Sequence, residues 1–128
     1  MADLATIYQM AADNADLADF IIVYIEEAHP TDGWAFPVNY DISQHRTIKD
    51  RLAAAAKVDV AQFPANVTMV VDNMSDDLNL NRAYGGLYER LYVIHSGTVA
   101  YQGRWGPLGF RTGEVADWLK VYRDTLNV

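Results

Sequence analysis

The residues best suited to acid–base chemistry gather just after the apolar segment Phe20–Ile25. Glu26 and Glu27 follow that segment directly, and His29 comes shortly after them. Histidine titrates near neutral pH, so His29 can donate or accept a proton, although a loop histidine can equally bond to the backbone. Neighbouring side chains of an extended segment point to opposite sides, so we expect only one glutamate to face a site. Tyr24 either presents its hydroxyl to that site or packs as an aromatic of the core.

The remaining histidines lie further along the chain. His45 falls near the start of a helix predicted over 45–56, where the helix dipole disfavours a proton and keeps the imidazole neutral and able to accept. A partly exposed helix-start residue is the alternative interpretation. His95 falls in a predicted hairpin and is expected to face solvent. The spacing of the histidines and acids matches no metal motif, so no metal site is predicted.

Apolar periodicity predicts a mixed α/β order for the elements that must position these residues. The segment 19–25 is short and β-branched, which is typical of a strand buried on both faces in a parallel sheet. A long loop over 26–43 follows it, and open α/β sheets carry their functional sites at such strand ends. The other predicted elements are helices at 2–15, 45–56, 78–84 and 113–126, and strands at 67–72, 89–94 and 98–101.

Local signals mark the ends and faces of several elements. Thr47 and Asp50 form a capping pair for the second helix. The residues of that helix expected to face the core are Ile48, Leu52 and Ala55. Ser96-Gly97 is a tight hairpin signal, and Thr112 is the expected N-cap of the last helix. The apolar face of the last helix consists of Val115, Trp118, Leu119, Tyr122 and Leu126.

Length and composition bound the class of protein. The chain has 128 residues, 51% of them hydrophobic, so we predict one folded domain over residues 1–128. A net charge of −7 without a Lys/Arg cluster argues against nucleic-acid binding. The longest apolar run is far shorter than the ~20 residues that cross a bilayer, and the first residues lack a signal-peptide pattern. The chain has no cysteine, hence no disulfide, no Cys-based zinc site and no thiolate nucleophile.

A long string of residues carries a family resemblance. Residues 23–34 read Val-Tyr-Ile-Glu-Glu-Ala-His-Pro-Thr-Asp-Gly-Trp, which composition alone would almost never produce. The stretch resembles the signature of the iodothyronine deiodinases, thioredoxin-fold selenoenzymes that remove iodine from thyroid hormones, and in particular the type 3 enzyme. The resemblance covers essentially the whole chain, through Gln44-His45-Arg46, Asp50-Arg51, Asp72-Asn73-Met74, Ala83-Tyr84-Gly85, residues 89–94 and 96–98, Tyr101-Gln102-Gly103 and Gly106-Pro107.

The resemblance implies an α/β, thioredoxin-like mixed sheet flanked by helices, and the reductive dehalogenation of iodinated phenols. In that reaction a selenolate attacks iodine, and the ring carbon gains a proton as iodine leaves. His29, with Glu26 or Glu27, Tyr24 and His45, would handle the proton. The residue matching His45 is thought to join a proton relay or to grip the hormone.

The same resemblance suggests residues that bind the substrate. Trp34 and Phe36 would line an apolar slot for the iodinated ring, or would simply anchor the loop. Arg104 is a candidate for binding the substrate carboxylate, although the basic residue of the type 3 pattern falls one position later, where this chain has Trp105.

One departure from the family concerns the nucleophile. In the family, selenocysteine or cysteine lies just before the helix predicted at 2–15, and that segment would end where Met1 begins. We therefore expect the nucleophile and the first strand of the fold upstream of this chain, which should be inactive alone. No bound cofactor is expected, and an external thiol would recycle the enzyme. The resemblance also implies a homodimer and an N-terminal membrane helix outside this chain, which as given is expected to be soluble and cytoplasmic.

Two further functions stay open. The first is a nucleophile-free thioredoxin-fold binding module that keeps the pocket for an aromatic ligand or a partner strand. The second is a peroxiredoxin-like thiol oxidoreductase, which shares the scaffold. The upstream codon separates the enzyme from the binding module, and iodide release against peroxide turnover separates the deiodinase from the peroxidase.

Overall fold

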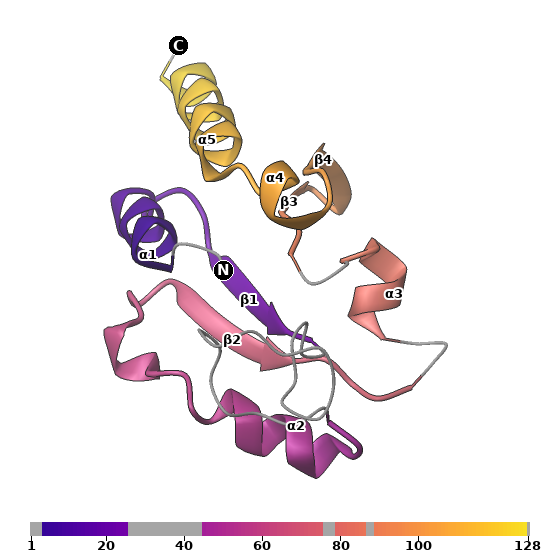
Figure 1. The fold of residues 1–128 in the computed structure, drawn as a ribbon. Helices are drawn as coiled ribbons and strands as arrows, with labels where there is room; N and C mark the ends of the chain where they lie inside the picture. The colour runs from indigo at the N-terminus through magenta and orange to yellow at the C-terminus, as the bar shows by residue number, and fades with distance from the viewer. Residues whose placement is uncertain (1–3, 26–44, 76–78, 87–88, 128) are drawn as a thin grey trace. The chain divides into compact units, whose positions relative to one another are not determined.

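The computed structural model describes residues 4–25, 45–75, 79–86 and 89–127 (Figure 1). In chain order the elements are α1 (Leu4–Asp13), β1 (Phe20–Tyr24), α2 (Ile48–Ala55), the 3-10 helix η1 (Val60–Gln62), β2 (Val67–Val71), α3 (Leu80–Tyr84), β3 (Tyr92–His95), β4 (Thr98–Gln102), α4 (Gly106–Gly109) and α5 (Thr112–Leu126). This order of helices and strands confirms the predicted mixed α/β class and adds two short helices, η1 and α4, to the predicted elements.

The chain divides into two compact units. Unit 1 consists of Met1–Phe20, Phe63–Thr68 and Glu89–Val128, and unit 2 of Ile21–Gln62 and Met69–Tyr88. The paired strands β1 and β2 begin in unit 1 and continue into unit 2. The prediction of a single domain over residues 1–128 stays a prediction.

Backbone hydrogen bonds show that β1 and β2 are parallel. In unit 1 the amide of Phe20 donates to the carbonyl of Asn66 at 2.8 Å. In unit 2 the amide of Asp72 donates to the carbonyl of Tyr24 at 2.9 Å. The residue numbers of the two partners rise together, which is the signature of a parallel pair.

The expectation that the first strand is buried on both faces is wrong. No residue of β1 is fully buried, and Ile21 exposes 67% of its surface. Along β2 burial alternates, from the buried Val67 to the exposed Val70. Within the described residues β1 has β2 as its one neighbouring strand, so the other edge of β1 has no strand of these residues beside it.

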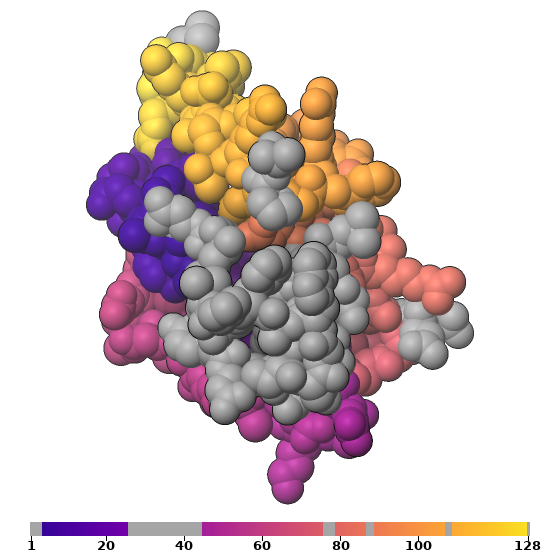
Figure 2. All heavy atoms as spheres, viewed as in Figure 1, coloured from indigo at the N-terminus to yellow at the C-terminus, as the bar shows by residue number. Residues whose placement is uncertain are grey.

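The core of unit 1 forms between α1 and α5. Its buried members are Met10, Val115 and Leu119. Partly buried apolar residues pack against them: Leu17, Ala18, Phe20, Leu91, Val93, Tyr101 and Trp118. The two helices lie side by side in Figure 1, and Figure 2 shows their side chains in contact, indigo against yellow.

Two details of the predicted last helix are wrong. The N-cap is Arg111, whose backbone is extended and whose side chain makes no capping bond, so the helix begins at Thr112 instead of being capped by it. Leu126 is 57% exposed because it lies at the end of α5, beyond the apolar contacts of the core. The rest of the predicted apolar face is confirmed, with Val115 and Leu119 buried and Trp118 and Tyr122 half-buried.

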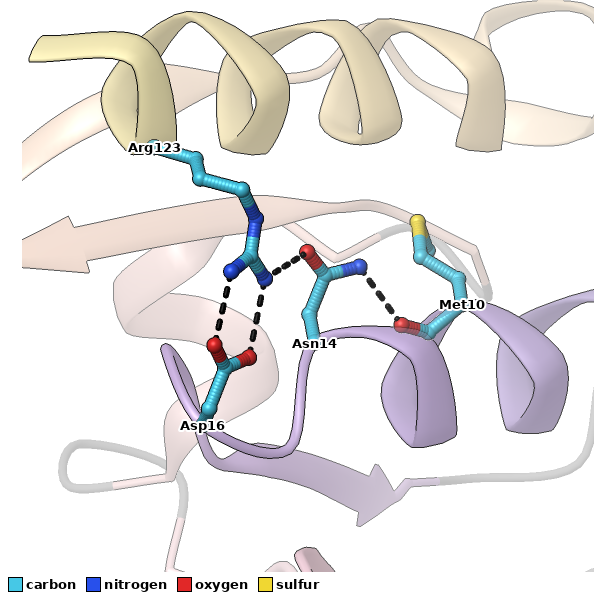
Figure 3. Close-up of polar contacts among 4 residues, drawn as sticks. All are labelled: Met10, Asn14, Asp16 and Arg123. Carbon is cyan, nitrogen blue, oxygen red and sulfur yellow. Dashed lines mark hydrogen bonds and ion pairs between the residues drawn. The ribbon is translucent and has the colours of Figure 1, made fainter. Parts of the chain in front are cut away.

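An ion pair ties the C-terminal half of α5 to the turn after α1 (Figure 3). Arg123 donates to both carboxylate oxygens of Asp16, at 2.7 and 2.9 Å, and to the Asn14 side-chain oxygen at 3.2 Å. Asn14 in turn donates to the carbonyl of Met10 at 2.8 Å. The hydrogen bond from Arg123 lowers the pKa of Asp16 below its ordinary value.

The predicted hairpin is confirmed. β3 and β4 pair antiparallel, from Tyr92 opposite Gln102 to His95 opposite Thr98, with an irregularity after Val93. Ser96 and Gly97 both have positive φ, 52° and 78°, which is the geometry of the tight turns that suit the twist of a hairpin.

In unit 2 the predicted capping box is confirmed, but the predicted buried face of the helix is not. Thr47 accepts from the amide of Asp50, and the Asp50 carboxylate accepts from the amide of Thr47. Ala55 is buried as expected, whereas Ile48 and Leu52 are 44% and 51% exposed. The buried residues of α2 are Arg51, Ala54 and Ala55. Arg51 turns inward because it makes the hydrogen bonds described next.

Candidate active site around His45

His45 lies two residues before Thr47, the N-cap of α2, in a segment that the capping box holds in place. The carboxylate of Asp50 accepts from the amides of both Arg46 and Thr47, at 3.1 and 3.2 Å. His45 itself is 7% exposed. The backbone on its C-terminal side is therefore fixed by hydrogen bonds, and its imidazole is largely removed from water.

Arg51 connects His45 to the end of β2. Its Nε donates to Nδ1 of His45 at 3.0 Å, and its Nη1 donates to the carbonyls of Asp72 and Asn73, both at 3.1 Å. Arg51 is also 7% exposed. A buried guanidinium is costly unless it is hydrogen-bonded, and here three bonds to uncharged acceptors compensate for the lost water.

Asp72 is the most deeply buried polar residue near the site, at 2% exposure. Its carboxylate accepts from the amides of Leu80 and Asn81, at 2.6 and 2.9 Å, at the start of α3. Helix N-terminal amides are otherwise unsatisfied and attract negative charge, which is why a carboxylate can be buried there. Since its amide also donates to Tyr24, Asp72 joins β1, β2, α3 and, through Arg51, α2.

Tyr24 and His45 are the two predicted catalytic residues that the structure brings together. Their ring centroids are 5.7 Å apart, and the planes are inclined by 34°. This is within the usual range for contacting aromatic rings. Tyr24 ends β1, so this contact lies where the strand ends, as the sequence predicted for the functional site.

Five other predicted residues lie outside the described part of the chain. Glu26, Glu27, His29, Trp34 and Phe36 all fall within 26–44. Their expected roles stay predictions.

Arg104 belongs to unit 1 and is exposed. The guanidinium of Arg90 lies over the ring of the next residue, Trp105, with its Cζ 5.1 Å from the ring centroid. The same Cζ lies 5.2 Å from the ring centroid of Tyr92. The Nε of Arg90 donates to the carbonyl of Gly103 at 2.8 Å. A cation therefore does lie beside Trp105, but it is supplied by Arg90 rather than by Arg104.

His95 is exposed, as expected, and it also has an aromatic contact that the sequence did not indicate. Its ring lies 4.9 Å from that of Tyr122, which stacks on Trp118 at 5.3 Å. Both distances between ring centroids are within the usual range for contacting aromatic rings.

Sequence reasoning missed Arg51 and Asp72 as parts of the site. Two signals pointed to them. Asp72 is the last residue of the strand predicted at 67–72, and both residues fall within segments that match the family pattern. Neither signal indicates that a cation within a helix would turn inward.

The described residues indicate neither a metal centre nor a membrane span. Among them, no group of three or more His, Cys, Asp or Glu side chains is arranged to hold a metal ion. None of the helices in the described ranges has the length and the apolar run that crossing a bilayer requires.

A family model described as Iodothyronine deiodinase matches residues 1–123. The chain belongs to the iodothyronine deiodinase family. The family is thioredoxin-like, in keeping with the α/β arrangement of this deiodinase-family chain. The prediction from residues 23–34 is thereby confirmed at the level of the family.

Individual relatives agree with this family match. The chain is 46% identical over 127 residues to the thyroxine 5-deiodinase of Sparus aurata, 44% over 124 residues to that of Aquarana catesbeiana, and 40% over 128 residues to that of Homo sapiens. These matches cover 98%, 96% and 99% of this deiodinase-family chain. They cover 46%, 45% and 41% of the relatives, so the chain spans less than half of their length.

Proposed function

We propose that this chain forms part of a reductive deiodinase that removes iodide from iodothyronines or related iodinated phenols. The observation that carries the proposal is the family match over residues 1–123. Thyroxine is the first substrate to test, because the relatives are named thyroxine 5-deiodinases. The buried His45, in contact with Tyr24 and hydrogen-bonded to Arg51, supplies a site suited to orienting a phenol.

The nucleophile belongs, in this proposal, to a selenocysteine or cysteine upstream of residue 1. Its anion attacks iodine, a bond from selenium or sulfur to iodine forms, and the electron pair of the carbon–iodine bond passes to the ring carbon, which takes a proton. The ring carbon is reduced and the nucleophile is oxidised. An external dithiol then reduces the nucleophile, becomes a disulfide and releases iodide, so that electrons and atoms balance.

The chain's own residues then have distinct proposed tasks. His29, with Glu26 or Glu27, provides the proton, and Tyr24 and His45 complete the shell around the phenol. Trp34 and Phe36 line the slot for the iodinated ring, and Arg104 is the candidate partner of the substrate carboxylate. A homodimer and a membrane helix in the upstream part belong to the same proposal.

The test uses the longer protein encoded with its upstream segment. Iodide release from thyroxine is measured with dithiothreitol as the thiol, beside a variant whose upstream nucleophile is alanine and beside the 128-residue chain. We expect release from the longer protein alone. Thyroxine binding without release would favour the binding module, and rapid peroxide reduction without release would favour a thiol peroxidase. Either result would overturn the proposal.

A further inference from the structure

We propose that Arg51 is a positioning residue that holds His45 as the neutral Nε2–H tautomer, so that His45 acts as a hydrogen-bond donor. The tautomer itself depends only on the geometry of unit 2. Its consequence for the reaction rests on the proposed deiodinase function.

The direction of one hydrogen bond carries the inference. Arg51 Nε lies 3.0 Å from His45 Nδ1. A guanidinium has donors and no acceptor, so Nδ1 must present its lone pair to Arg51. Neutral imidazole carries one N–H, and the proton therefore lies on Nε2.

Charge reinforces the same assignment. A second proton on Nδ1 would set an N–H against an N–H and place two positive charges side by side. Both side chains are 7% exposed, so water would screen this repulsion poorly. The ring of Tyr24 also contacts that of His45, and a phenol carries no charge near pH 7. The arrangement thus favours a neutral His45.

Arg51 is itself held firmly enough to impose this choice. Moving its guanidinium away from His45 would also break the bonds from Nη1 to the carbonyls of Asp72 and Asn73. Asp72 is in turn fixed by the carbonyl of Tyr24 and by the amides of α3. The lone pair of Nδ1 is therefore occupied by a group that has little freedom to leave.

This assignment divides the work of the two histidines in the proposed reaction. Loss of the Nε2 proton from a neutral imidazole would leave an imidazolate, which is far too basic to form near neutral pH. His45 can therefore polarise or orient a substrate oxygen through Nε2–H, but it does not deliver the proton to the ring carbon. That proton must come from another group, for which His29 is the proposed source.

The expectation from the helix dipole is refined by the same geometry. In this proposal the Arg51 guanidinium, rather than the start of α2, keeps the imidazole neutral. The acceptor nitrogen is already in use, so the useful property of His45 is donation rather than acceptance.

The test is long-range ¹H–¹⁵N spectroscopy of the histidine rings in the ¹⁵N-labelled 128-residue chain at pH 7. The three rings are assigned from His29→Gln and His95→Gln variants. For His45 we expect an unprotonated Nδ1 and a protonated Nε2. A protonated Nδ1, an imidazolium or rapid averaging of both tautomers in the unsubstituted chain would overturn the proposal.

Variants then separate positioning from packing. Arg51→Met should let the Nδ1–H tautomer appear, Arg51→Lys should restore the original pattern in part, and Lys49→Met should leave it unchanged. Lys49 is the matched control because it is an exposed cation on the same helix. An Arg51→Met ring pattern like that of the unsubstituted chain would overturn the proposal. If Arg51→Met does not fold, the ring spectra of the unsubstituted chain and of Arg51→Lys still decide the tautomer of His45.

A kinetic arm distinguishes this inference from the proposed function. In the longer protein, Arg51→Met should lower kcat for iodide release by about 10- to 100-fold, the usual effect of losing the group that orients a histidine, with less change in KM. Arg51→Lys should recover part of that loss. An unchanged kcat would contradict the catalytic consequence. Absence of iodide release from the unsubstituted protein would instead overturn the deiodinase function, while the ring spectra would still decide the tautomer.

Discussion

Two arginines, one in each unit, are held in opposite ways. Arg123 of α5 is one-third exposed and pairs with the carboxylate of Asp16, which is two-thirds exposed. Arg51 of α2 is buried and donates to a ring nitrogen and two backbone carbonyls. Water can take over the bonds of Arg123 if they break, but it reaches those of Arg51 only by opening unit 2. We therefore expect that stability and site geometry depend far more on the buried arginine.

The largest effect is expected at Asp72, to which Arg51 is bonded. Asp72→Ala leaves the amides of Leu80 and Asn81 without their carboxylate and should lower the free energy of unfolding by about 3 kcal/mol. Urea unfolding followed by circular dichroism measures the loss. Asp72→Asn, which keeps one acceptor oxygen, should lose less, and Asp117→Ala, an exposed change on α5, should be close to neutral. Equal losses for Asp72→Ala and Asp117→Ala would contradict this account.

Arg51→Met should have the next largest effect, lowering the free energy of unfolding by about 2 kcal/mol. The substitution keeps an apolar stem but leaves Nδ1 of His45 and two carbonyls without their donor. The same urea experiment measures it, with Lys49→Met as the control for loss of a positive charge from α2. If both variants lose the same small amount, the buried arginine is no more important than an exposed lysine, and the comparison between the two arginines fails.

Thr47→Ala tests the local support of the site. It removes the side-chain acceptor for the amide of Asp50 at the start of α2 and should cost about 1 kcal/mol. Thr47→Ser keeps the hydroxyl and should recover most of that loss. A loss as large as that of Arg51→Met would mean that the cap, and not the arginine, holds this segment.

The smallest effect is expected at the exposed pair, and it depends on pH. The folded-state pKa of Asp16 lies below its ordinary value of 3.8, so the ionised carboxylate contributes stability above that value. The contribution is lost as the pH falls through the lowered folded pKa. The urea midpoint of Asp16→Asn should therefore lie slightly below that of the unsubstituted chain at pH 6, and the difference should vanish in strong acid. High salt should reduce it as well, and a difference that persists in acid would refute the ion-pair explanation.

The sequence predicted best what depends on neighbouring residues. The Thr47/Asp50 capping box needs residues three positions apart, and the Ser96-Gly97 turn needs two adjacent ones. Most of the apolar face of α5 followed from helical periodicity alone. The family match of residues 23–34 was equally local, because a continuous string of residues carries it.

What the sequence did not predict depends on distant partners. Periodicity placed Ile48 and Leu52 inside and said nothing of Arg51, whereas the structure buries Arg51. The acceptors that draw it inward are carbonyls at positions 72 and 73, and backbone carbonyls have no sequence signal. The burial of β1 was likewise overestimated, since it depends on how many strands lie beside it.

Hydrogen exchange at the amides of Leu80 and Asn81 can report on the surroundings of His45, because both amides donate to Asp72. Their exchange with solvent deuterium requires the start of α3 to open, and that opening releases the residue whose carbonyl holds Arg51. Slow exchange at these two amides would therefore report that the surroundings of His45 are closed. A ligand that orders the imidazole should slow them further.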